Sequence, residues 1–327
     1  MEDLYCYTVT VKLSADEKVM NEVEAKKLKL WERRCEMIKV IASDMDGTLL
    51  NNNHVFSEKT IQSIKKACEK GFRFMVVTGR NFVSAMQPLK DTGLVCDYIV
   101  SSGAVIRNPK QEIIESIVMG FDECEYLYNK LKEYPLGILF CSEEMNHILG
   151  THEEVDECIL DYVKFFHETA GREELRKTKI YQQMWERTKE LPDYAALREN
   201  NVPISKMFLF SEDVEMLQEI KTELNKNKNL AVSSSLNTNL EVTHVRAQKG
   251  PILKRYIESL GYTMDEVMVL GDSLNDYSMM EIDFGATIAM ENAEQEIKSV
   301  AKYITKSNEE DGVAYVIDEM MKMYGME

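Results

Sequence analysis

The sequence lacks several features that would place the protein outside the cytoplasm. None of its apolar runs reaches the roughly 18 residues of a membrane helix. The acidic N-terminus has no basic segment followed by an apolar one, so we expect no signal peptide. No two cysteines form a Cys-x-x-Cys pair, and an odd, scattered set predicts free thiols in a reducing compartment. These cysteines are Cys6, Cys35, Cys68, Cys96, Cys124, Cys141 and Cys158. We therefore expect a cytoplasmic protein.

Positive charge is also scarce. The chain has 39 Lys and Arg residues against 56 Asp and Glu residues, a formal net charge of −17. Such a surface repels nucleic acid phosphates and anionic lipid head groups, so we expect neither nucleic acid nor membrane as a partner. A phosphorylated ligand must then be attracted by a local cation. The length of 327 residues allows two domains.

The first 36 residues differ from the rest of the chain. Apolar residues alternate with mostly polar ones from Tyr5 to Leu13, a pattern that predicts a strand. Ser14, followed by Glu17, predicts the start of a charged helix that runs to about Glu36. We expect residues 1–36 to form an N-terminal extension, to which the sequence assigns no function.

From Met37 onward, short apolar runs alternate with helical patterns. The runs at 38–42, 72–77, 97–100 and 267–270 each end at a polar cluster. Strands that alternate with helices predict right-handed crossovers and a parallel sheet. Ligands of such sheets bind beyond the carboxyl ends of the strands. We therefore expect an α/β fold with a Rossmann-like parallel-sheet core whose polar strand ends line one site.

The middle of the chain interrupts this alternation. Its pattern predicts strands at 111–119, 136–141 and 206–210, and helical segments at 122–133, 153–198 and 213–226. The strand–helix alternation resumes at Lys249 and continues to the end of the chain, with strands at 287–290 and 303–305 and a helix at 313–323. We predict an α+β domain, residues 117–243, inserted into a core of residues 37–116 and 244–327.

Four polar clusters lie at or near predicted strand ends or helix starts. They are Asp44-Met45-Asp46-Gly47-Thr48, Thr78-Gly79-Arg80, Lys249, and Gly271-Asp272-Ser273-Leu274-Asn275-Asp276. Each has an ordinary interpretation on its own. The aspartates are common in turns and helix caps, and a lysine is usually a solvated surface residue.

Together, these clusters predict a site for phosphoryl transfer. Asp44, Asp46, Asp272 and Asp276 would bring carboxylates to one sheet edge, where their mutual repulsion calls for a cation. Oxygen ligands of this kind suit Mg²⁺. Lys249 adds a positive charge. Thr78 and nearby backbone N–H groups supply donors for phosphate oxygens.

In these residues the chain resembles the haloacid-dehalogenase-like hydrolases, specifically the Cof-type phosphatases with an inserted cap domain. The resemblance extends from about Met37 to the C-terminus, and four motifs in order are far more specific than one Asp-x-Asp. The similar segments are Asp44-Met45-Asp46-Gly47-Thr48-Leu49-Leu50, Val77-Thr78-Gly79-Arg80, Lys249-Gly250, Gly271-Asp272-Ser273-Leu274-Asn275-Asp276 and Glu310-Asp311-Gly312-Val313-Ala314.

The resemblance implies a role for each residue. Asp44 would attack phosphorus and form an aspartyl-phosphate. Asp46 would protonate the leaving oxygen and then activate water, which requires a raised pKa. Thr78 and Lys249 complete the implied catalytic set. Mg²⁺ would be held by the Asp44 carboxylate, the Asp46 backbone carbonyl and Asp272, while Asp276 would orient Lys249 or a metal-bound water. Phosphate oxygens would be bound by the Met45 amide, Thr78, Gly79, Lys249 and Asn275.

Two further positions bear on this interpretation. The family commonly has asparagine before the Gly-Ala that ends the third strand, and here Ser102 stands in that place. Serine is shorter and lacks the amide donor, so a substrate contact made there is in doubt. The histidines show no metal-ligand spacing, and His54, which follows the first strand, is the one to test for a role in the site.

The expected function is Mg²⁺-dependent hydrolysis of a small phosphorylated metabolite, either a sugar phosphate or a phosphorylated cofactor such as FMN or pyridoxal phosphate. Two alternatives stay open. A phosphomutase of the same superfamily would pass the phosphoryl group to a second sugar position. A sensor would bind a phosphorylated metabolite without turnover. We expect a monomer or a homodimer.

The N-terminal extension gives a first testable prediction. A chain that begins at Met37 should release phosphate from its substrate as fast as the full chain, because all the motifs lie beyond residue 36. The two chains are compared by phosphate release at equal concentration. A large loss of activity in the shortened chain would contradict the prediction.

Overall fold

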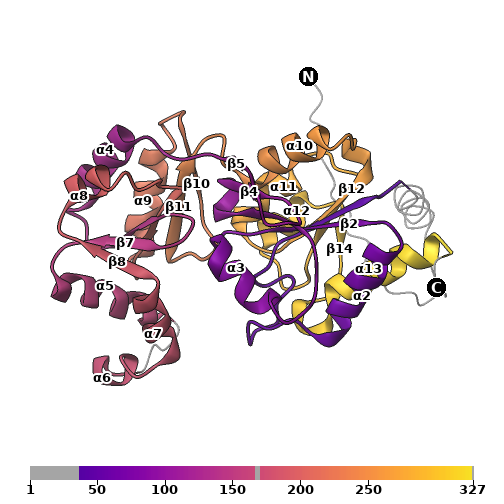
Figure 1. The fold of residues 1–327 in the computed structure, drawn as a ribbon, viewed down its shortest axis with the longest axis horizontal. Coiled ribbons are helices and arrows are strands. Elements are labelled where there is room, and N and C mark those ends of the chain that lie inside the picture. Colours follow the sequence, from indigo (N-terminus) through magenta and orange to yellow (C-terminus); the bar gives the residue numbers. More distant parts are fainter. Residues whose placement is uncertain (1–36, 166–169, 326–327) are drawn as a thin grey trace.

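A computed structural model describes residues 37–165 and 170–325, so the predicted N-terminal extension lies outside the described residues. Two sheets organise this part of the chain (Figure 1). The core sheet has eight strands in the order β14-β13-β12-β1-β2-β3-β4-β5. The cap sheet has six strands in the order β10-β11-β9-β6-β7-β8. We call the cap sheet with its helices the cap, and the core sheet with its helices the core.

The core sheet is parallel from β14 to β3 and antiparallel at β4 and β5. Its strands are β1 (Val40–Ser43), β2 (Arg73–Val77), β3 (Asp97–Val100), β4 (Val105–Arg107), β5 (Ile113–Ser116), β12 (Val267–Gly271), β13 (Ala286–Ala289) and β14 (Tyr303–Ile304). Its helices are α2 (Glu58–Glu69), α3 (Phe82–Leu89), α10 (Lys249–Ser259), α11 (Tyr277–Met280), α12 (Gln295–Val300) and α13 (Gly312–Met323). The predicted parallel-sheet core is confirmed.

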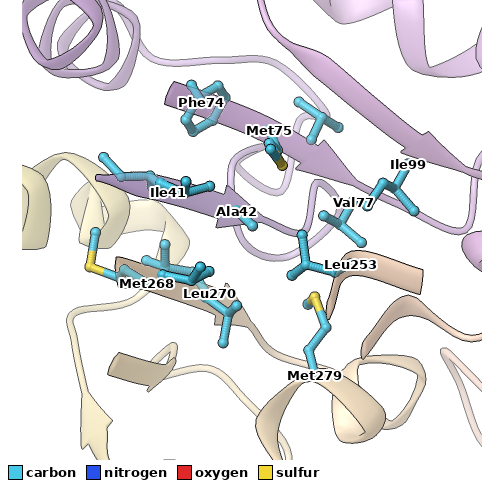
Figure 2. Close-up of a cluster of buried hydrophobic side chains, with 14 of the residues drawn as sticks. Ile41, Ala42, Phe74, Met75, Val77, Ile99, Leu253, Met268, Leu270 and Met279 are labelled. Atoms are coloured by element: carbon cyan, nitrogen blue, oxygen red, sulfur yellow. The ribbon is translucent and has the colours of Figure 1, made fainter. Parts of the chain in front are cut away.

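Burial on both faces explains the continuous apolar runs of the core strands. Every residue of β1 and β12 is buried, and Figure 1 shows α10 above the sheet and α2 and α13 below it. Figure 2 shows Ile41 and Met75 among the packed side chains of neighbouring strands, with Leu253 of α10 and Met279 of α11 against them. Parallel strands covered by helices on both sides have no polar face.

The cap is an α+β unit inserted between β5 and α10, as the sequence predicts. Its strands are β6 (Gly137–Cys141), β7 (Asn146–Leu149), β8 (Thr188–Leu191), β9 (Lys206–Phe210), β10 (Leu230–Ser233) and β11 (Asn239–His244). Its helices are α4 (Phe121–Leu131), α5 (His152–Lys164), α6 (Arg172–Leu175), α7 (Lys179–Glu186), α8 (Tyr194–Glu199) and α9 (Val214–Leu224). The last cap strand ends at His244, one residue beyond the predicted boundary of 243; the boundaries themselves stay a prediction.

The prediction of a helical region at 153–198 is wrong in part. The region contains α6, α7 and most of α5 and α8, but the strand β8 lies between α7 and α8. Only the two ends of β8, Thr188 and Leu191, are buried, and the two residues between them are exposed. So short a strand has neither an apolar run nor a clear alternation. Its place is set by parallel pairing with β7, which the local sequence does not reveal.

Within the described ranges, no helix combines the length and the apolar character required to cross a bilayer. Cys68, Cys96, Cys124, Cys141 and Cys158 are free thiols. Burial raises the pKa of Cys96 to about 12, which suits a packing role in the core and not a nucleophilic one.

A buried carboxylate fastens α10 to the core sheet. Asp97, at the start of β3, is fully buried and accepts hydrogen bonds from Arg73 Nε at 2.6 Å and Nη2 at 2.7 Å. The hydroxyl of Tyr256, on α10, donates to the same carboxylate at 2.6 Å. Two strands and a helix thus share one acceptor.

The substitution Asp97→Ala should lower the free energy of unfolding by about 2 to 4 kcal/mol, because it leaves Arg73 and Tyr256 without their acceptor. Tyr256→Phe removes a single hydrogen bond and should cost about 1 kcal/mol. Urea unfolding measures both, with Asp91→Ala on the exposed loop as the control. If Asp97→Ala and Tyr256→Phe lower the free energy of unfolding by the same amount, the Asp97 carboxylate does not join β2, β3 and α10 as described.

Candidate active site

Three adjacent strands bring the predicted motifs to one edge of the core sheet. Strand β1 lies between β12 and β2. Ser43 is in register with Leu270 of β12 and Val76 of β2, so the three strands end at similar heights. Asp44 follows β1, Thr78 follows β2 and Asp272 follows β12. The sheet therefore places the first, second and fourth motifs side by side.

Lys249 is buried at the centre of this edge. It is the first residue of α10 and is 1% exposed, so its interpretation as a solvated surface residue is wrong. Its Nζ donates to Oδ1 of Asp44 at 2.6 Å and to Oδ1 of Asp276 at 2.7 Å. It also donates to Oδ1 of Asn275 at 3.0 Å. One ammonium group therefore joins the first and fourth motifs.

The carboxylates around Lys249 form an acidic cluster. Oxygen atoms of Asp44, Asp272 and Asp276 all lie within 4.8 Å of one another. Burial, followed by the negative charge of Asp276, raises the pKa of Asp44 well above its usual value. The same two causes raise the pKa of Asp272 to about 7. Lys249 alone does not offset this concentration of negative charge. An all-oxygen donor set with excess negative charge fits a hard divalent cation such as Mg²⁺.

The loop after β1 packs closely against Asp272 of the fourth motif. Gly47 has φ +76°, and a Cβ at this position would lie 2.3 Å from Oδ2 of Asp272. The hydroxyl of Thr48 donates to Oδ1 of Asp272 at 2.8 Å. A larger residue at position 47 would push the Asp272 carboxylate out of the cluster, so glycine is required for close approach.

Asp276 is held from two sides. Its Oδ1 accepts from Lys249, while its Oδ2 accepts from the backbone N–H groups of Asp272 at 3.0 Å and Ser273 at 3.2 Å. Asp276 is fully buried. Both of its oxygens are engaged, one by Lys249 and the other by the two backbone N–H groups.

The predicted phosphate-binding residues fall into two groups. Lys249 and Asn275 contact each other, as described above, on the side of the fourth motif. Thr78 and Gly79 follow β2 on the other side of β1. Thr78 is buried, its N–H donates to Ile99 at 2.8 Å, and its Oγ1 accepts from the Arg80 N–H at 3.2 Å. Buried Met45, which follows Asp44, lies between the two groups in the sheet order.

The side chain of Asp46 is not part of the acidic cluster. Arg80 donates to both of its oxygens, from Nε at 2.7 Å and from Nη2 at 2.5 Å. His54 Nδ1 lies 3.6 Å from Oδ1. Burial by itself raises the pKa of Asp46, but the nearby His54 and the hydrogen bonds and charge of Arg80 outweigh it and hold the pKa well below the usual range. The raised pKa predicted for Asp46 is wrong for this arrangement, because Arg80 stabilises the carboxylate.

Ser102 occupies an unusual backbone conformation. Its φ of 59° is left-handed, a region that asparagine tolerates better than serine. The hydroxyl is turned toward the cap, where it donates to the carboxylate of Glu241 and lies 3.3 Å from Nζ of Lys206. The amide that the family commonly places here is thus replaced by a hydroxyl bound between two charged cap residues.

The histidines other than His54 have ordinary structural contacts. Nδ1 of His147 lies 3.3 Å from the carbonyl oxygen of Phe140, and His152 pairs with Glu190. Nδ1 of His244 accepts from the Arg246 N–H at 3.1 Å. His167 lies outside the described residues. His54 therefore remains the histidine to test.

A cavity of about 410 Å³ opens between the cap and this edge of the core. Lys249 and Asn275 lie in its wall. Its cap side is formed by residues of α9 and β10, and its core side includes Ser102 and Tyr277. The cavity therefore lies between cap and core on the side of Lys249 and Asn275, while Asp44 and Asp46 are not part of its lining.

Sequence reasoning missed some of the residues that shape this site. Arg80 belongs to a motif quoted above, but its contact with Asp46 crosses 34 positions of the chain. Thr48 likewise reaches Asp272 over 224 positions. Lys206 and Glu241 carry no motif at all. The only local signal for Lys206 was its charge at the start of the strand predicted at 206–210, and charges are common in surface strands. Glu241 lies in β11, for which no strand was predicted.

Comparison with known proteins shows similarity to one family of hydrolases. A family model described as haloacid dehalogenase-like hydrolase matches residues 41–317. The chain is similar to a 5-amino-6-(5-phospho-D-ribitylamino)uracil phosphatase of Bacillus subtilis, at 31% identity over 290 residues that cover 87% of this chain and 98% of the relative. It is also similar to a pyridoxal phosphate phosphatase of Escherichia coli, at 24% identity over 287 residues that cover 85% and 97% of the two chains.

A solved structure supports the same assignment. A haloacid dehalogenase-like hydrolase from B. subtilis matches with a TM-score of 0.73 and 26% identity, covering 86% of this chain and 99% of the other. The match spans both the core and the cap. The chain is a phosphatase, and it belongs to the haloacid dehalogenase-like hydrolases.

Proposed function

We propose that this phosphatase hydrolyses the phosphomonoester of a small metabolite with Mg²⁺, through an aspartyl-phosphate on Asp44. The observation that carries the proposal is the buried Asp44 carboxylate, one oxygen of which is held by Lys249 at 2.6 Å within the acidic cluster. The other oxygen is left to attack phosphorus. A fixed carboxylate beside a buried ammonium group and a cation site is the arrangement that phosphoryl transfer requires.

The reaction divides into two steps. An oxygen of Asp44 bonds to phosphorus while the ester oxygen leaves and takes a proton from Asp46. A water molecule then bonds to phosphorus, its proton passes to Asp46, and the bond to Asp44 breaks to release phosphate. Lys249 and Asn275 bind phosphoryl oxygens on one side, and Thr78 with the Gly79 and Met45 amides binds them on the other.

Asp46 can serve both steps only if its contact with Arg80 changes. A carboxylate whose pKa is held low is ionised and has no proton to give. Lengthening the hydrogen bonds from Arg80 removes that stabilisation and allows burial to raise the pKa. We therefore assign the present geometry to an ionised Asp46, as it stands before it takes up a proton.

Asp44, the backbone carbonyl of Asp46 and Asp272 are the proposed Mg²⁺ ligands. When bound, the cation offsets the repulsion between the nucleophile and the phosphate. The raised pKa values of Asp44 and Asp272 support this assignment, because both carboxyls need added positive charge to stay ionised.

The substrate class follows from the relatives and the cavity. The two relatives named above are phosphatases for a phosphorylated ribityl-uracil and for pyridoxal phosphate. The cavity of about 410 Å³ has room for an organic group of that size. We therefore propose a phosphorylated cofactor, a cofactor precursor or a sugar phosphate as the substrate.

Substitutions at the two aspartates test the mechanism. Asp44→Asn should lower kcat on the order of 10⁴-fold or more, because it removes the nucleophile. Asp46→Asn should lower kcat by roughly 10² to 10⁴-fold, because it removes the acid–base group. Phosphate release is measured on a panel of 5-amino-6-(5-phospho-D-ribitylamino)uracil, pyridoxal phosphate, FMN and sugar phosphates.

Asp91→Asn, on an exposed loop, is the matched control and should leave kcat unchanged. Free phosphate without an isomerised sugar phosphate separates a hydrolase from a mutase. Full activity in Asp44→Asn would rule out the aspartyl-phosphate. No turnover of any substrate by the folded wild type with Mg²⁺ would favour a sensor or a substrate outside the panel.

Metal binding is tested separately by stability. Mg²⁺ at about 100 times its dissociation constant should stabilise the wild type by roughly 2.7 kcal/mol. The melting temperature should therefore rise with Mg²⁺ and return to its original value with EDTA. Asp272→Asn removes a proposed ligand and should lose this response, while Asp91→Asn should keep it. If Mg²⁺ raised the melting temperature of Asp272→Asn as much as that of the wild type, the cation would bind at another site.

A further inference from the structure

The cap carries a buried ion pair that is separate from the Lys249 cluster. Lys206 begins β9, and Glu241 lies in the neighbouring strand β11. Nζ of Lys206 lies 3.1 Å from Oε2 of Glu241, and the two side chains are only 9% and 3% exposed. Two charges of the cap are thus removed from water together.

The pair also contacts the core, at the turn Thr78-Gly79-Arg80 that follows β2. Nζ of Lys206 donates to the carbonyl oxygen of Gly79 at 2.8 Å. It also donates to Oγ of Ser102 at 3.3 Å, and the Ser102 hydroxyl in turn donates to Glu241. Gly79 directly follows Thr78 in the turn after β2. The cap therefore touches the core at the turn proposed to bind phosphate.

The contact at Gly79 is close on both sides of its backbone. A Cβ on Gly79 would lie 3.2 and 3.3 Å from the two carboxylate oxygens of Glu241, so the carboxylate rests against this glycine. The carbonyl is held by Lys206 as described. Among residues 37–165 and 170–325, the amide N–H of Gly79 has no hydrogen-bond acceptor. That N–H is therefore available to donate to a phosphate oxygen, and it belongs to the residue that the pair contacts.

Stability alone does not explain an ion pair at this place. Removing two charges from water costs several kcal/mol, and apolar residues of similar volume are often as stable or more so. Burial raises the pKa of Glu241, but the charge of Lys206 and the hydrogen bond from Ser102 outweigh burial and keep the pKa below its usual value. Glu241 is therefore ionised, within reach of a site for an anion.

We propose that Lys206 and Glu241 are positioning residues of the phosphate site, which fix the Gly79 peptide from the cap. The phosphate-binding turn is then complete only while the cap rests on the core. The inference rests on the proposed function, since it assigns a task within the same site. Neither residue touches the reacting atoms; both act through Gly79.

Substitutions separate this role from a simple effect of charge. If the pair acted only through its field, Glu241→Gln would tighten phosphate binding, because it removes a negative charge near the anion. A positioning role predicts the opposite sign. We expect Glu241→Gln to weaken the binding of inorganic phosphate several-fold and Lys206→Met to weaken it about tenfold, with a fall in kcat of roughly 10 to 100-fold. Lys206→Arg should recover part of the loss.

The measurements are titration calorimetry with inorganic phosphate in the presence of Mg²⁺, together with kcat, KM and melting temperature. Lys226→Met breaks an exposed ion pair with Glu223 in the same cap and is the matched control. The double variant Lys206→Met with Glu241→Met replaces the pair by apolar side chains. It should keep its melting temperature and lose phosphate affinity like Lys206→Met.

Two results would overturn the inference. One is tighter phosphate binding in Glu241→Gln, and the other is phosphate affinity within about twofold of the wild type in the folded double variant. Should Lys206→Met fail to fold, Glu241→Gln and the double variant decide. A wild type that releases no phosphate from any ester would refute the proposed function, whereas the calorimetric comparison would still decide the role of the pair.

Discussion

The contact of the Lys249 ammonium with Asp44 and Asp276 is the interaction on which the motif-bearing edge of the core sheet depends. Three carboxylates within 4.8 Å would repel one another strongly in a buried place, and Lys249 offsets part of that repulsion from within the fold. It can do so only if α10 begins at this edge of the sheet. Tyr256, further along α10, is tied to Asp97 of β3. The helix that delivers the lysine is thus fastened at both ends, and the geometry of the site follows from the packing of the core.

The strongly negative chain buries two lysines near the ends of the core strands, each beside carboxylates. Lys249 of the core contacts Asp44 and Asp276, and Lys206 of the cap contacts Glu241 and the carbonyl oxygen of Gly79. Their charges are matched by carboxylates, so neither one serves as a free attractor for substrate. Both hold the groups around them in place, and in the proposed mechanism Lys249 also binds phosphoryl oxygens. What remains to draw in the phosphate is the short-range set of donors at the strand ends, with the cation that the acidic cluster fits.

The sequence predicts the core better than the cap for a physical reason. Apolar runs such as 97–100 and 267–270 are buried on both faces, so their composition alone defines strands and places the motif residues at their ends. Strand β8 has no such run, because its position depends on pairing with β7. The contacts of Arg80 with Asp46 and of Lys206 with Glu241 span 34 and 35 positions. The tertiary fold determines which charged side chains pair at that sequence separation, and no local sequence pattern encodes it.

Asp46 shows how the cap and the chemistry are linked. Arg80 holds this residue as a carboxylate, and Nη1 of the same guanidinium lies 3.4 Å from the carbonyl oxygen of Ser84. Arg187 of the cap donates to the hydroxyl of Ser84 at 3.0 Å. Burial, and then the positive charge of Arg80, lower the pKa of Arg187, so the two guanidinium groups oppose each other across this residue. Ser84 of α3 therefore contacts both Arg80, which holds the Asp46 carboxylate, and Arg187 of the cap. The Asp46 ion pair is connected with the cap through this residue.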